Sequence, residues 1–109
     1  MVLKIGVVGA AGRMGCRLCA AVDAAADAVL VGATLAPGDA RAGEDVAALL
    51  GGPARDVALS EDAVALFRDA DAVLDFTTPA ACVDFAALAA QAQTIHVIGV
   101  TGLDEAQDA

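Results

Sequence analysis

The feature that most restricts the fold is a glycine-rich turn between an apolar stretch and a helix-compatible stretch near the start of the chain. Residues 5–15 read IGVVGAAGRMG, which gives the spacing G-x-x-G-x-x-G. A pyrophosphate needs backbone N–H groups that no side chain covers, at a helix N-terminus where the helix dipole also favours negative charge. Small residues over 9–12 permit this approach, and Gly15 lets the helix pack closely on the strand. The turn therefore predicts a strand–turn–helix unit that binds a dinucleotide.

Apolar stretches alternate with helix-compatible stretches along the rest of the chain. We predict strands over 2–8, 28–35, 57–59, 72–76 and 95–99. We predict helices over 13–25, 61–68 and 79–92 (the last with Thr78 as N-cap), a short helix around 45–50, and the start of another helix at 103. Ser60 is the expected N-cap of the helix over 61–68. This alternation is typical of right-handed βαβ units, so the expected fold class is α/β, with a doubly wound, Rossmann-like parallel sheet.

The length of 109 residues allows one small domain, which we place over 1–109. A complete sheet of this type has about six strands, and only the five named above are predicted. The fifth strand would then present an apolar edge with no neighbour. We therefore expect the chain to be the N-terminal piece of a longer protein, truncated before the last strand of the sheet.

The acidic composition argues against two classes of partner. Six basic and 15 acidic residues give a formal net charge of −9, and such a surface repels phosphate backbones and anionic lipids. We therefore expect neither a nucleic acid nor a membrane as partner. The longest uncharged run, 85–103, contains polar residues and reads as helix, turn and strand rather than as a membrane span. A bound dinucleotide is also anionic, so backbone amides and Arg13 must offset the global charge at its site.

The cysteine, histidine and lysine residues predict no catalytic or metal site. Cys16 and Cys19 stand one helical turn apart, but a zinc site needs a second ligand pair, so we expect structural, partly buried thiols. His96 lies within the last predicted strand, where we expect a hydrogen-bonded structural histidine. Lys4 begins the first strand, at the end opposite the predicted crevice. With no disulfide framework and no signal peptide before Lys4, the expected location is cytoplasmic.

Two further segments directly follow predicted strands, 75–79 (DFTTP) and 99–102 (GVTG). The carboxyl ends of parallel strands share one edge of the sheet, so these segments and the glycine turn would converge on one crevice. There the hydroxyls of Thr77 and Thr101 are placed to hydrogen-bond a ribose or a nicotinamide amide, and Phe76 to lie against a ring. The alternative explanation of the first segment alone is a helix cap with proline at the first helical position.

Taken together, the motifs V-x-G-x-x-G-R-M-G, D-F-T-x-P and G-x-T-G resemble the N-terminal domain of the dihydrodipicolinate (4-hydroxy-tetrahydrodipicolinate) reductase family. The resemblance implies a cytoplasmic, tetrameric reductase of the lysine and diaminopimelate pathway that uses NADPH or NADH. It also implies that a downstream substrate domain, with an H-H-x-x-K-x-D segment absent here, binds the small dicarboxylate substrate. The chain alone is then catalytically incomplete and carries no catalytic residue. The cofactor-binding residues implied are Gly9, Ala10, Ala11, Gly12, Arg13, Met14, Phe76, Thr77, Gly99, Val100 and Thr101.

Two positions depart from the pattern of that family. Leu35 and Ala36 stand where family members usually carry an acidic residue, which holds the adenosine ribose, followed by an arginine, which accepts a 2′-phosphate. The nearest carboxylate, Asp39, lies beyond a Pro-Gly turn. Val100 stands where the family usually has threonine. We therefore expect a weakened cofactor affinity, and the sequence does not decide between NADH and NADPH.

Two other interpretations stay open from the sequence. The first is a nucleotide-binding module without catalysis, which the departures at Leu35, Ala36 and Val100 favour. Such a module would bind a dinucleotide, and its natural chain would end at Ala109. A subunit-interaction domain with an empty crevice would instead use the edge of the fifth strand, and would form oligomers that bind no dinucleotide.

Overall fold

A computed structural model describes residues 2–75 and 79–98, and the side chains of 2–75 and 84–97. Its strands are β1 (Leu3–Val8), β2 (Ala28–Thr34), β3 (Leu59–Ser60), β4 (Ala72–Asp75) and β5 (Ile95–Ile98). Its helices are α1 (Arg13–Ala24), α2 (Ala47–Leu50), α3 (Ala63–Asp69) and α4 (Pro79–Ala92). These elements follow the predicted order of strands and helices, and the helix expected from 103 lies outside the described residues.

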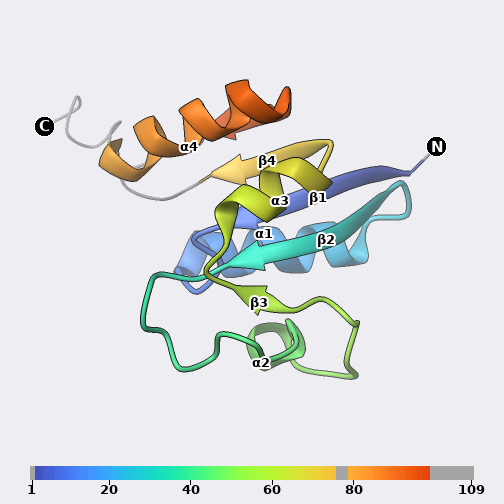
Figure 1. The fold of residues 1–109 in the computed structure, drawn as a ribbon. Coiled ribbons are helices and arrows are strands. Elements are labelled where there is room, and N and C mark those ends of the chain that lie inside the picture. The colour runs from blue at the N-terminus through green and yellow to red at the C-terminus, as the bar shows by residue number, and fades with distance from the viewer. Residues whose placement is uncertain (1, 76–78, 99–109) are drawn as a thin grey trace, which may run out of the picture.

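The strands form one parallel sheet in the order β3-β2-β1-β4-β5. This confirms the α/β fold class and the parallel sheet. From β1 the chain crosses to β2 on one side, whereas β4 lies on the other side and leads on to β5 (Figure 1). The boundary between β1 and β4 is therefore the switch point of the sheet, where open α/β folds bind ligands outside the carboxyl ends of the strands.

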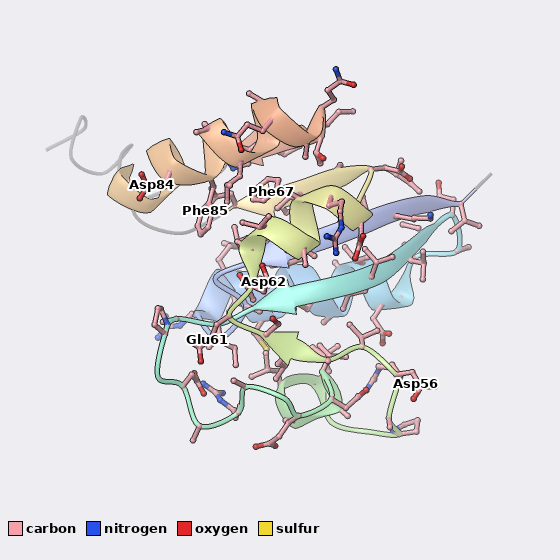
Figure 2. The ribbon with its side chains drawn as sticks, viewed as in Figure 1. Asp56, Glu61, Asp62, Phe67, Asp84 and Phe85 are labelled. Atoms are coloured by element: carbon pink, nitrogen blue, oxygen red, sulfur yellow. The ribbon has the colours of Figure 1, made fainter. Side chains whose placement is uncertain are left out.

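Helices cover both faces of this sheet: α1 packs on one face, and α3 and α4 on the other (Figure 1). Alternate side chains of β1 point to opposite faces of the sheet: Ile5 and Val7 lie in the core under α1, and Val8 lies in the core under α3 and α4. Because both faces are covered, an almost continuously apolar strand is the expected pattern. Phe67 of α3 and Phe85 of α4 point toward one another (Figure 2), with ring centroids 6.0 Å apart.

The short strand before α3 and the start of that helix differ from the sequence-based expectation. The strand expected over 57–59 is shifted toward the C-terminus, because Ser60 pairs with Thr34 of β2. Ser60 is therefore a strand residue, and its expected role as the helix N-cap was wrong. Asp62 caps α3 instead, and its carboxylate accepts a hydrogen bond of 3.0 Å from the Ala65 N–H.

Candidate functional site

The glycine turn lies at the switch point, between the end of β1 and the start of α1. Gly9 has φ +73°, a left-handed conformation that glycine adopts without steric cost. The Gly12 N–H donates to the Gly9 carbonyl at 3.2 Å, and the Cys16 N–H donates to the Gly12 carbonyl at 2.9 Å. Gly12 is the N-cap of α1 and makes no side-chain cap hydrogen bond. The start of this helix is therefore formed by small residues and backbone groups.

The third glycine of the motif is required by packing. An ideal Cβ on Gly15 would lie 2.0 Å from the carbonyl oxygen of Gly9. That atom belongs to the backbone, so a side-chain movement does not relieve the overlap. A Cβ on Gly12, in contrast, would meet only the same oxygen at 3.5 Å, which is an ordinary contact. Gly15 thus allows α1 to press against the turn, whereas the fold itself tolerates a side chain at Gly12.

The backbone N–H groups of the turn fall into two sets. The Ala10 N–H donates to the Thr34 carbonyl at 2.9 Å, and the Gly12 N–H is bonded within the turn, so both already have acceptors. The N–H groups of Ala11, Arg13 and Met14 have no assigned acceptor within the described part of the chain, as is usual for the first amides of a helix. Three donors at a helix N-terminus are therefore open to an anion.

Arg13 adds a positive charge at the same place. Its side chain is exposed, and it forms no ion pair among the residues that the structure describes. The side chain of Met14 is also exposed, at 38% of its surface. In contrast, Ala10 is fully buried beneath the turn. The site thus combines open amides with one exposed cation, which is a chemistry suited to a pyrophosphate.

The segment after β2 lacks the polar groups that usually hold an adenosine ribose. Leu35 is 5% exposed and belongs to the apolar core, and Ala36 is exposed. The nearest carboxylate, that of Asp39, forms an ion pair with Arg41, with two side-chain hydrogen bonds of 2.8 and 3.0 Å. Hydrogen bonds from Arg41 lower the pKa of Asp39 to about 2. Leu35 and Ala36, which directly follow β2, thus offer no polar side chain, and the carboxylate of Asp39 is already paired with Arg41.

Five of the predicted cofactor-binding residues lie outside the described residues: Phe76, Thr77, Gly99, Val100 and Thr101. The strands that precede them are described. Asp75, the last residue of β4, pairs with Val8 at the end of β1 and with Ile98 at the end of β5. The three strands that lead into the three predicted segments therefore end side by side.

The sequence analysis did not identify the buried pair formed by Asp75 and His96. The Nε2 atom of His96 lies 2.6 Å from the Oδ2 atom of Asp75, which confirms the expected hydrogen-bonded strand histidine. His96 pairs in register with Val73, two residues before Asp75 and on the same face of the sheet. The alternation of side chains along the two strands could therefore have indicated that His96 and Asp75 lie on the same face, but only if the register of β5 against β4 had been known.

The C-x-x-C segment is structural. Cys19 is fully buried under the sheet, and this burial raises the pKa of its thiol to about 12. Cys16 is half-buried, and its sulfur lies 3.6 Å from the Leu49 carbonyl. No group of three or more metal-ligand side chains occurs in the described part of the chain. Among the same residues, no helix has the length and apolar character needed to cross a membrane.

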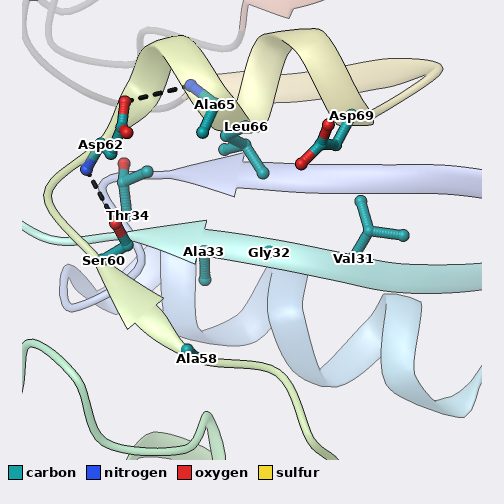
Figure 3. A pocket seen from close by; sticks show the side chains of 10 residues that line it. All are labelled: Val31, Gly32, Ala33, Thr34, Ala58, Ser60, Asp62, Ala65, Leu66 and Asp69. Carbon is teal, nitrogen blue, oxygen red and sulfur yellow. Dashed lines mark hydrogen bonds between the residues drawn. The ribbon is translucent and has the colours of Figure 1, made fainter.

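A separate hollow of about 120 Å³ lies between α3 and the strands β2 and β3 (Figure 3). Its residues are Val31, Gly32, Ala33, Thr34, Ala58, Ser60, Asp62, Ala65, Leu66 and Asp69. The Ser60 hydroxyl accepts a hydrogen bond from the Asp62 N–H, and the Asp62 carboxylate caps α3. These two polar side chains therefore have roles in the fold, and no residue of the glycine turn lines the hollow.

The chain is similar to known proteins over nearly its whole length. A family model described as "Dihydrodipicolinate reductase, N-terminus" matches residues 3–109. A 4-hydroxy-tetrahydrodipicolinate reductase of Cereibacter sphaeroides is 51% identical over 100 residues, which are 92% of this chain and 37% of that protein. The chain thus spans little more than a third of this relative.

Two solved structures share the fold. The dipicolinate-bound dihydrodipicolinate reductase from Paenisporosarcina sp. TG-14 matches with a TM-score of 0.72 at 21% identity, over 92% of this chain and 38% of that one. The aspartate semialdehyde dehydrogenase with NADP from Candida albicans matches with a TM-score of 0.68 at 16% identity, over 91% and 30%. At these identities the two matches support the Rossmann-like fold alone.

Proposed function

The chain belongs to the dihydrodipicolinate reductase family, and we propose that it is the nicotinamide-dinucleotide-binding part of a 4-hydroxy-tetrahydrodipicolinate reductase, with NADPH or NADH as coenzyme. The observation that carries this proposal is the set of open N–H groups at Ala11, Arg13 and Met14, at the switch point of a parallel sheet. These donors and the N-terminal end of α1 would bind the pyrophosphate.

Each predicted cofactor-binding residue has a role in this proposal. Gly9, Ala10 and Gly12 would give the turn its shape, with Gly12 leaving space for the phosphates to approach the backbone. The Arg13 guanidinium would add a charged contact to the pyrophosphate. The residues after β4 and β5 would surround the nicotinamide and its ribose: Phe76, Thr77, Gly99, Val100 and Thr101.

The paired state of three acids supports anion binding in a chain with a net charge of −9. Asp39 is held by Arg41, and Asp75 shares a hydrogen bond with His96. The Asp45 carboxylate accepts hydrogen bonds from three backbone N–H groups. Because these carboxylates have partners, their charge is partly offset within the fold.

Within this proposal the coenzyme supplies the hydride, and the chain orients the coenzyme. The dicarboxylate substrate would bind to the part of the relatives that this chain does not span. We propose further that the whole protein is a cytoplasmic homo-oligomer of the lysine and diaminopimelate pathway.

A module that binds nucleotide without catalysis is the second candidate. It is favoured by the end of β2, where Leu35 is buried and Ala36 carries no polar group to hold a ribose. A natural chain that ends at 109 and binds dinucleotide would support this candidate over the reductase.

The proposed function is tested by titrating the full chain into NADPH and NADH and following nicotinamide emission. The sequence contains no tryptophan or tyrosine, so protein emission does not interfere. We expect saturable enhancement for at least one coenzyme, and its loss in Gly12→Val, because the branched side chain would occupy the space near the phosphates. Gly12 has φ −69° and ψ 162°, a conformation that valine adopts readily.

The matched control is Ala24→Val, at the exposed opposite end of the same helix. It should bind coenzyme like the unsubstituted chain. Unchanged binding by Gly12→Val, with an unchanged unfolding temperature, would show that the coenzyme does not approach this turn.

A further inference from the structure

A buried acid–base pair links β5 to the switch point. The His96 and Asp75 side chains are 7% and 0% exposed, and the distance between Nε2 and Oδ2 is 2.6 Å. The ring of Phe67 meets the imidazole edge to face, with centroids 5.5 Å apart and planes at 88°. A buried carboxylate is costly unless hydrogen bonds stabilise it. The imidazole therefore helps to fix the position of the Asp75 side chain in the core.

The place of Asp75 in the sheet connects this pair with the proposed coenzyme site. Asp75 is the last residue of β4 and pairs with Val8, the last residue of β1, which directly precedes the glycine turn. Neighbouring strands lie about 4.8 Å apart. The carboxylate is thus carried by the strand next to the turn, at the residue from which the DFTTP segment continues.

We propose that His96 is a positioning residue for coenzyme binding, acting through its hydrogen bond to Asp75, a role that rests on the proposed function. With 7% exposure, the imidazole is too deeply buried to contact a ligand at the rim. Its hydrogen bond ties the last residue of β4 to β5, the two strands that lead into the segments proposed to surround the nicotinamide and its ribose. Loss of the bond loosens one wall of the crevice while the apolar core stays in place.

Substitutions at His96 separate a hydrogen-bonding role from simple filling of space. Glutamine places an N–H donor near the position of Nε2, whereas asparagine is too short and leucine has no donor. We expect His96→Gln to bind NADPH within about twofold of the unsubstituted chain, and His96→Leu and His96→Asn to bind about tenfold more weakly. A residue that only fills space would give the opposite order, because leucine suits a buried site best.

The experiment uses the full chain, NADPH titration by nicotinamide emission, and thermal unfolding by circular dichroism. Val22→Ala is the control for general destabilisation, since Val22 is buried at the far end of α1. It should unfold at a lower temperature and bind NADPH normally when folded. This pattern, together with rescue by glutamine, supports the proposal.

Folded His96→Leu that binds NADPH like the unsubstituted chain overturns the proposal. If the leucine and asparagine variants do not fold, the glutamine variant decides, since a loss of affinity in a folded glutamine variant also overturns it. If the unsubstituted chain binds neither coenzyme, the proposed function itself fails, and the role of His96 with it. A failure confined to the His96 variants leaves the proposed function intact.

Discussion

Replacing Gly15 with alanine is expected to reduce stability and coenzyme affinity together. The added Cβ would lie 2.0 Å from the Gly9 carbonyl oxygen, 2.8 Å from its carbonyl carbon and 3.0 Å from the Cα of Ala10. All three are backbone atoms in a packed turn. Carbon and oxygen atoms in contact lie about 3.3 Å apart, so the first turn of α1 must move by about 1 Å.

The magnitude of the effect follows from this displacement. Overpacking of this kind costs about 1–3 kcal/mol in the free energy of unfolding. For a domain of this size the unfolding temperature then falls by roughly 5–15 °C. The amides of Arg13 and Met14 move with the helix, so their hydrogen bonds to the pyrophosphate weaken and we expect the affinity for NADPH to fall by about tenfold.

The assay is thermal unfolding by circular dichroism, followed by NADPH titration well below the transition. Gly12→Ala is the matched control for stability, because its Cβ would lie at an ordinary 3.5 Å from the Gly9 oxygen. Its unfolding temperature should stay within about 3 °C of the unsubstituted chain. If Gly15→Ala unfolds at the temperature of the unsubstituted chain, the inferred close packing of α1 on the turn is refuted.

Three further predictions concern the loops and the thiols. Backbone hydrogen bonds lower the pKa of Asp45 from 3.8, so its carboxylate stabilises the fold above pH 3.8, and this effect is lost as the pH falls through the folded-state pKa. Asp45→Asn should therefore lower the unfolding temperature at pH 7 and flatten its dependence on acid pH. An unchanged pH profile of the unfolding temperature would contradict this. Cys19 should resist alkylation by iodoacetamide at pH 8 in the folded chain, since its thiol is buried with a pKa of about 12, while Cys16 reacts faster; peptide mass spectrometry checks the order. Asp39→Asn should raise the affinity for NADPH relative to NADH, because Arg41 is released for the 2′-phosphate; an unchanged ratio of dissociation constants would exclude that role.

The strands and most helices could be predicted because their signals are local. Apolar runs and one glycine motif suffice for β1, β2, α1 and their order along the chain. The start of α3 could not be read in the same way, since Ser60 and Asp62 are both good N-caps. Pairing of Ser60 with Thr34 decides between them, and this contact depends on how the sheet assembles.

The position of the glycine turn, between the first strand and the first helix, was predicted from the sequence, and its internal bonding was not. The glycine spacing indicates a turn with exposed amides, but it does not reveal that Ala10 donates to the carbonyl of Thr34. The partner of His96 likewise depends on the register of β5 against β4. Such contacts join residues far apart in the sequence, and the periodicity of apolar residues within one sequence carries no information about them.

The most direct test of the account is a two-dimensional amide NMR titration of the ¹⁵N-labelled full chain with NADPH and, separately, NADH. We expect the largest shifts at Ala11, Arg13 and Met14, with a smaller response at Ala10, whose N–H is already bonded to Thr34. Amides at the far end of α1, around Ala24, should not move. If the N–H signals of residues 11–14 stay unchanged at saturating concentrations of both coenzymes, no pyrophosphate binds at this helix N-terminus and the proposed function is wrong.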